Sequence, residues 1–190
     1  MNIDTDSYEV QGLPEFIDDT RVLMEKIRTL GFQEARELWR CNESLTELNY
    51  RRFQDMDLGR ALTPAVLAYE GLQYQHMAPG VFTTGALSYI GEHLRILSGF
   101  YGILSPFDGV VPYRLEMQAK LSVGGSRDLY DFWGNRLYKS LTGGGSRVIL
   151  NLASREYARC IEKYVTPEDT FITVEFGELI NGKIRQKGTL

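Results

Sequence analysis

The chain has 190 residues, of which 43% are hydrophobic, with eleven Tyr, nine Phe and two Trp. This length and aromatic content suffice for one sizeable core, so we expect a single domain over residues 1–190. The net charge of −4 differs from the basic footprint of a nonspecific nucleic-acid binder. Residues 93–190 nevertheless carry thirteen Lys/Arg against ten Asp/Glu. This mild asymmetry is most simply ordinary solvated surface, but any anionic partner is expected in this part of the chain.

Cysteine usage and hydropathy indicate a cytoplasmic protein without membrane contact. Cys41 and Cys160 fit no CxxC pattern, so the sequence suggests neither a zinc site nor a disulfide framework. No apolar run approaches the roughly 18 residues of a membrane span, and no signal-peptide pattern opens the sequence. We therefore expect a reducing compartment, no metal and no cofactor.

Helical patterns dominate the first sixty residues. Apolar residues at helical spacing follow Pro14, a second helical stretch covers residues 32–40, and Ser44 starts a capping-box sequence before a third. Together these patterns predict a helical hairpin structure. The short apolar run over residues 65–69 is instead predicted to be a buried strand.

Strand and helix patterns alternate in the rest of the chain. We predict helices over residues 87–97, 129–141 and 154–163, extended segments over 110–121, 148–150 and 171–176, and a hairpin turn at Asn181-Gly182. Residues 148–150 have the composition of a central strand. Strands interleaved with helices predict a mixed α/β or α+β domain, in which helices flank a mixed sheet.

Two glycines three residues apart, Gly99 and Gly102, form the first candidate site. Glycine permits positive φ and close backbone approach, so successive N–H groups can turn toward a phosphate, as in a helix-hairpin-helix element. Pro106 removes an N–H donor and leaves little room for a second helix directly after Gly102. On this local sequence alone, a helix-ending Gly99 that leads into a strand is the favoured interpretation.

A second candidate site surrounds Arg114. Alternation along an extended segment places Arg114 and Glu116 on one face, where they most simply form a structural ion pair. In the functional alternative, Arg114 lies in a cleft with His93 and Arg95 and completes an anion pocket. Asp108 is most simply a turn residue.

Nucleophile and nucleotide motifs are weak throughout the sequence. Ser154 lacks the GxSxG context of a nucleophile elbow and is interpreted as a helix N-cap. The glycine runs at residues 124–125 and 143–145 are not followed by Lys-Ser/Thr, as a P-loop requires. We therefore do not expect a conventional enzyme.

Four segments together carry a family resemblance that none carries alone. They are LSGFYGIL at residues 97–104, SPFDGVVPYRLEM at 105–117, LYDFWG at 129–134 and NLASREY at 151–157. In this order and spacing they resemble the YaaA family of bacterial peroxide stress proteins. The resemblance implies a fold peculiar to that family, a helix-hairpin-helix-like element in a positively lined cleft, binding to duplex or structured DNA, and a part in limiting peroxide damage connected with intracellular iron.

Carried over to this sequence, the resemblance implies a set of DNA-binding residues, and we expect a monomer. The residues are His93, Arg95, Ser98, Gly99, Tyr101, Gly102, Tyr113 and Arg114. Members of the family usually begin with an apolar strand and a Ser-Pro-Ala-Lys segment, and they continue into a basic helix and a further strand. We expect residues 1–190 to form one YaaA-type domain that lacks these segments.

Two other functions remain open at this point. One is an enzyme acting on a small or nucleic-acid substrate, with His93, Arg95, Asp108, Arg114 and Glu116 converging in a cleft; it requires a perturbed titratable group beside a cavity. The other is a stress-linked protein-interaction module, which a flat exposed apolar patch would favour.

Overall fold

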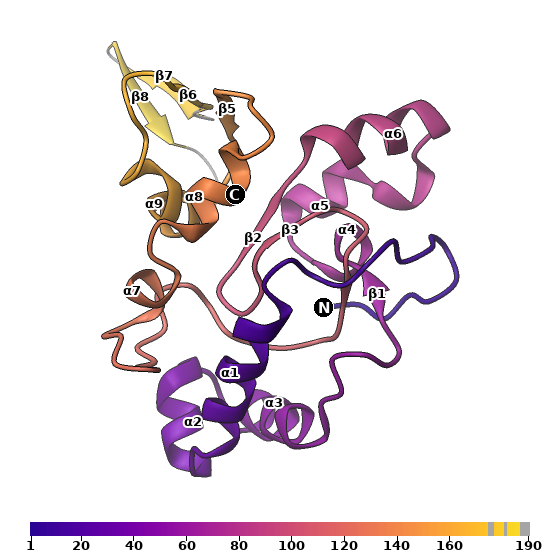
Figure 1. Cartoon of the computed structure of the whole chain (residues 1–190), viewed down its shortest axis with the longest axis vertical. Coiled ribbons are helices and arrows are strands. Elements are labelled where there is room, and N and C mark those ends of the chain that lie inside the picture. Colours follow the sequence, from indigo (N-terminus) through magenta and orange to yellow (C-terminus); the bar gives the residue numbers. More distant parts are fainter. Residues whose placement is uncertain (175–176, 181, 187–190) are drawn as a thin grey trace.

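Three helices form one end of the structure, opposite the last strands (Figure 1). We analysed a computed structural model, which describes residues 1–174, 177–180 and 182–186. The three helices, all predicted from the periodicity, are α1 (Ile17–Arg28), α2 (Phe32–Trp39) and α3 (Glu43–Asp55). Both α1 and α2 pack against α3, which confirms the helical hairpin structure expected for this part of the chain.

The apolar run Ala65–Ala68 forms a buried helical turn, α4, where the sequence predicts a strand. It directly follows β1 (Thr63–Pro64), which pairs antiparallel with β4 (Gly109–Val110). The N–H of Ala65 then donates to the carbonyl of Asp108 at 2.9 Å. A short apolar run signals burial but does not distinguish a strand from a buried helical turn, which is why the prediction is wrong.

A β-hairpin occupies the place of the expected helix-hairpin-helix-like element. Between β1 and β4 lie α5 (Leu72–Met77), a 3-10 turn (Pro79–Val81), α6 (Thr84–His93), β2 (Ile96–Ser98) and β3 (Gly102–Leu104). α6 ends at His93 rather than at Leu97. β2 and β3 pair antiparallel, with Ser98 opposite Gly102, so both arms are strands. A strand does follow Gly99, but the helix-ending role expected for Gly99 is wrong, because α6 ends at His93 and Gly99 lies in the hairpin turn.

The helix predicted over residues 129–141 is divided into α7 (Leu129–Trp133) and α8 (Arg136–Thr142). Gly134 lies between them with φ +53°, a conformation that ends a helix and that glycine adopts without a steric cost. Among the residues that the structure describes, none of the helices combines the length and apolar character needed to cross a membrane.

The described part of the chain has four separate two-stranded sheets in place of the single mixed sheet that we expected. The last two are β5 (Val148–Asn151) parallel to β6 (Thr170–Thr173), connected through α9 (Arg155–Glu162), and β7 (Gly177–Ile180) antiparallel to β8 (Lys183–Gln186). Val148 and Leu150 are 64% and 57% exposed, so β5 is not the central strand predicted. Helices with small sheets confirm the mixed α/β class.

The predicted hairpin signal at Asn181-Gly182 falls between β7 and β8. These strands are paired, with Ile180 opposite Lys183, and Gly182 has φ +76°, as a two-residue hairpin connection requires. Asn181 itself lies outside the described residues, as do residues 175–176 at the end of the strand predicted over 171–176.

Phe100, at the tip of the β2–β3 hairpin, lies at the centre of the main core. Its ring is 5.4 Å from that of Phe53 on α3 and 4.9 Å from those of Tyr101 and Tyr113. Gly99 beside it lies against the backbone of the 115–117 segment: a Cβ at this position would be 2.5 Å from the Leu115 carbonyl oxygen. The hairpin therefore joins the helical end of the molecule to the extended segment that follows β4.

Replacing Gly99 with alanine is expected to lower the free energy of unfolding by about 1–3 kcal/mol, because the added methyl group meets backbone that has no room to shift. Chemical denaturation of the variant measures this loss. Gly85→Ala is the matched control, because its Cβ meets nothing within 4 Å and it lies in α6; that variant is expected to be as stable as the parent or slightly more so. Equal stability of Gly99→Ala and the parent would contradict the close approach.

Candidate anion-binding site

The hairpin residues of the predicted site are buried and bonded to one another. Ser98 Oγ lies 2.6 Å from Tyr113 Oη, and it accepts hydrogen bonds from the N–H groups of Phe100 and Tyr101. Tyr101 Oη in turn accepts from the N–H of Val111. All these side chains are buried, so neither the hydroxyl groups nor the turn N–H groups face solvent.

The two glycines of the hairpin serve packing. Gly102 has the predicted positive φ, +77°, but a Cβ there would lie 2.9 Å from Leu137 and Trp133 side chains. The indole N–H of Trp133 donates to the Gly99 carbonyl at 3.1 Å. The tight core around both glycines argues against the phosphate cradle that the sequence suggested, because a phosphate has no access to these N–H groups in this structure.

His93 and Arg95 lie at the exposed end of α6, away from the pocket that Arg114 lines. The His93 side chain lies against the Tyr89 ring and 3.8 Å from the Glu92 carboxylate. Arg95 donates to the carbonyls of Gly91 and Leu94, so its guanidinium is bonded to the end of its own helix. Neither His93 nor Arg95 lines the pocket that contains Arg114.

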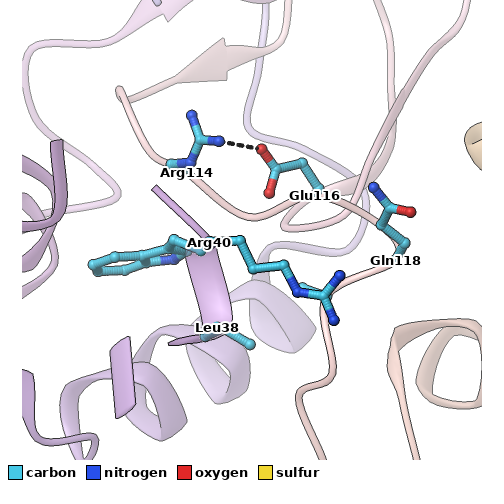
Figure 2. Close-up of a pocket in the computed structure, with 7 residues that line it drawn as sticks. Leu38, Arg40, Arg114, Glu116 and Gln118 are labelled. Carbon is cyan, nitrogen blue, oxygen red and sulfur yellow. Dashed lines mark ion pairs between the residues drawn. The ribbon is translucent and has the colours of Figure 1, made fainter. Parts of the chain in front are cut away.

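Arg114 instead lines a pocket between the end of α2 and the extended segment after β4 (Figure 2). Its volume is about 200 Å³, and its lining residues are Leu38, Trp39, Arg40, Arg114, Glu116, Gln118 and Ala119. The α2 side supplies an arginine and a tryptophan, and the extended segment supplies an ion pair and an amide. Polar groups from segments far apart in the sequence thus converge on one hollow.

The charges of the pocket are unbalanced toward the positive. Arg114 Nη2 lies 2.7 Å from Glu116 Oε1, which confirms the ion pair predicted from the alternation. Arg40 is exposed and makes no ion pair with any of the described residues, and in Figure 2 its side chain extends toward the Gln118 side of the pocket. One arginine is therefore free to attract an anion, while the other is only partly neutralised.

Two buried N–H groups in the pocket wall lack hydrogen-bond partners. They are Trp39 Nε1 and Arg114 Nε, and both belong to lining residues. An unsatisfied buried donor costs about 1–3 kcal/mol, more where it is charged, so two such donors in one wall are a marked local cost. Neither atom is reached by solvent here, so these two donors are a local cost beside the pocket and not contacts open to a ligand in this structure.

Arg40 also holds a backbone conformation that non-glycine residues rarely adopt. It follows the last residue of α2 with φ 46° and ψ 46°, and its N–H donates to the Arg36 carbonyl. Helices commonly end in this left-handed conformation, but usually with glycine, because a Cβ there is costly. An arginine at this position therefore retains a side chain at the pocket rim at the expense of local strain.

Sequence reasoning found only one wall of this pocket. Alternation identified Arg114 and Glu116, whereas Trp39, Arg40 and Gln118 carry no motif. In a sequence, a left-handed helix end is usually recognised by a glycine. Here that position is Arg40, so no local signal indicated that the Arg40 side chain lies beside Arg114.

Comparisons with known proteins identify the relatives of the chain. A sequence model of the family described as "Peroxide stress protein YaaA" matches residues 1–190. A UPF0246 protein of Agathobacter rectalis is 49% identical over 189 residues, which cover 100% of this chain and 76% of the relative. Another from Lactiplantibacillus plantarum is 50% identical, with 100% and 76% covered, and one from Lachnoclostridium phytofermentans is 51% identical, with 95% and 70% covered.

Replacing Arg40 with glycine is expected to stabilise the protein by about 1 kcal/mol, because glycine relieves the left-handed strain at the end of α2. Thermal and chemical denaturation measure the change. Ala78→Gly is the matched control, since Ala78 ends α5 with φ 47° and does not line this pocket; a similar gain is expected there. A loss of stability in Arg40→Gly alone would show that contacts of the Arg40 side chain stabilise the fold. It would contradict the view that this side chain is kept to bind an anion.

Proposed function

The chain belongs to the peroxide stress protein YaaA family, and we propose that it acts in the peroxide stress response by binding DNA through the Arg40–Arg114 pocket. The family supports the stress-related role, and the pocket supports the partner. In this proposal the protein is a cytoplasmic monomer that limits oxidative damage to DNA, in connection with intracellular iron.

The pocket carries the proposal because arginines line it from two sides and one of them has no ionic partner among the described residues. The arginine without such a partner is Arg40, whereas Arg114 is paired with Glu116. Phosphate oxygens are acceptors only, and arginine binds them with paired, charge-assisted hydrogen bonds. Contacts to phosphate account for half or more of protein–DNA hydrogen bonds, so a site of this kind suits the DNA backbone.

We propose binding rather than catalysis because the acid–base candidates are dispersed. His93 and Asp108 do not line the pocket that contains Arg114 and Glu116. Burial raises the pKa of Asp108 to about 6, but one of its oxygens accepts the N–H of Ser105 in a turn, as expected for a turn residue. The described residues also include no group of three or more His, Cys, Asp or Glu placed to hold a metal ion.

Exposed apolar side chains of the β5–β6 sheet favour a second candidate function, protein interaction. In the parallel register, Leu150 lies opposite Ile172, and paired residues of parallel strands point to the same face. Exposed apolar residues of this region are Val148, Leu150, Leu152, Ile172 and Val174. An apolar face of a parallel sheet is usually covered, so this face suits a protein partner, independently of the anion pocket.

DNA binding at the pocket predicts a specific response to charge removal. Arg40→Gln and Arg114→Gln are each expected to weaken duplex binding across sequences and to lower the slope of log affinity against log salt by about one. Fluorescence anisotropy over a salt series measures both quantities, and denaturation confirms that the variants are folded. Arg51→Gln on α3 is the matched control, because Arg51 is exposed and does not line the pocket.

The same titration distinguishes this pocket from the cleft predicted from the sequence. Arg95→Gln is expected to bind DNA as the parent does, because the Arg95 guanidinium is bonded to the end of α6. A loss of affinity in Arg95→Gln with none in Arg40→Gln would move the interface to α6. Equal affinity and equal slope for all four variants would refute DNA binding by these arginines.

A further inference from the structure

The surroundings of the pocket suit contact with one phosphate rather than with a row of them. Glu116 lines the pocket, and Glu156 lies against the same segment, where its Oε1 accepts the backbone N–H of Gln118 at 3.1 Å. Duplex DNA carries one negative charge for about every 1.7 Å of its axis, and proteins that follow it neutralise many phosphates. Two arginines beside two glutamates do not provide such a track.

The size of the pocket also favours a phosphate at the end of a strand over a phosphate within it. About 200 Å³ is less than the roughly 300–1,000 Å³ typical of sites that enclose a whole small molecule. A phosphate that terminates a strand enters a hollow of this size without the second sugar that flanks an internal phosphodiester. Its charge is about −1.5 to −2 at neutral pH, against −1 for the diester, so it gains more from two arginines.

We propose that the pocket binds a terminal phosphate monoester, at the phosphorylated end of a DNA strand. This inference rests on the proposed function and names its ligand. The terminal oxygens provide acceptors for Arg40 and Arg114, which line the pocket from α2 and from the extended segment after β4. One Nη of Arg114 is already paired with Glu116, so Arg40, which is free of such a pair, attracts the phosphate most strongly.

The ligand is one that oxidation generates. Strand scission at an oxidised deoxyribose leaves phosphate groups at the break, whereas intact duplex presents only internal diesters. A protein with this pocket therefore distinguishes broken DNA from the excess of unbroken DNA by the end group, without reading the sequence. The class of reaction that supplies the ligand is oxidative or hydrolytic cleavage of the DNA backbone.

The test compares DNA molecules that share one sequence and differ only at the ends. Duplexes with 5′-phosphate, 3′-phosphate or hydroxyl ends, and a covalently closed dumbbell without ends, compete for the 190-residue chain in an anisotropy titration. A phosphate end is expected to bind at least about tenfold more tightly than a hydroxyl end, the gain of one charged hydrogen bond. This ratio is expected to fall to about one in Arg40→Gln and Arg114→Gln, and to persist in Arg51→Gln.

A pH series provides a second readout that separates a monoester from a diester. The second pKa of a phosphate monoester is near 6, so preference for the phosphate end is expected to rise between pH 5 and 7.5 as the dianion forms. The hydroxyl-ended duplex serves as the control at each pH, because a change in the charge of the protein affects binding of both duplexes. A flat ratio across this range overturns the monoester.

The outcomes separate this inference from the proposed function. Equal affinity for all ends, with binding still dependent on Arg40 and Arg114, overturns the terminal phosphate and leaves DNA binding intact. Absence of binding to every DNA overturns both. If inorganic phosphate or a deoxynucleoside monophosphate binds while DNA does not, the pocket takes free phosphate compounds and the strand end is rejected. A phosphate preference unchanged in both glutamine variants also overturns the inference, because the site then lies elsewhere.

Discussion

The contact between Gly99 and the backbone of residues 115–117 is the constraint on which the pocket depends. There is no room at Gly99 for even one carbon, since a Cβ would lie 2.5 Å from the Leu115 carbonyl oxygen. One residue earlier, Ser98 Oγ is bonded to Tyr113 Oη at 2.6 Å. The hairpin thus fixes the extended segment on both sides of Arg114. Ser98, Gly99 and Tyr113, which the family resemblance assigns to binding, make the contacts that hold the segment around Arg114 in this structure.

The opposite wall depends on the same core. Trp39 stacks on Phe53 with ring centroids 5.6 Å apart, and Phe53 meets Phe100 edge to face at 5.4 Å. Phe100 is the neighbour of Gly99 at the hairpin tip, so the end of α2 and the extended segment both pack against the same part of the core. Arg40 and Arg114, distant in sequence, are therefore held across the pocket by packing that involves neither of their charged groups.

Elements with strong periodicity could be predicted from the sequence, whereas those set by tertiary contacts could not. The three N-terminal helices repeat apolar residues over several turns, and the alternation of Arg114 and Glu116 sufficed to predict their ion pair. Even so, Asn42 rather than Ser44 caps α3, with its Oδ1 accepting from the N–H of Leu45. Local capping signals two residues apart compete, and the fold decides between them.

The hairpin and the second wall of the pocket escaped prediction for a physical reason. Gly99 and Gly102 are needed for close approach to residues far along the chain, and a glycine pair in sequence does not reveal whether a phosphate or a carbonyl lies opposite. The left-handed conformation of Arg40 could not be predicted for the same reason, because it is determined by how α2 ends against α3 and not by the Arg40 side chain. Sequence reasoning therefore located the arginine on the extended segment and missed the one that faces it.

Three local costs of the described residues fall in the lining of one pocket, although Ala61 and Ala78 hold the same left-handed conformation elsewhere. Left-handed φ at Arg40 and the two unpartnered N–H groups of Trp39 and Arg114 all belong to the lining of a single pocket. A glycine at position 40 would remove the first cost, and an acceptor would remove the other two; among the described residues no acceptor pairs with either N–H group. Strain and unsatisfied donors persist where the surrounding fold imposes them, and such places are commonly functional sites. An acceptor anion does not relieve the left-handed backbone of Arg40, but that conformation keeps an arginine without an ionic partner among the described residues at the pocket rim, and this placement supports the proposed anion ligand.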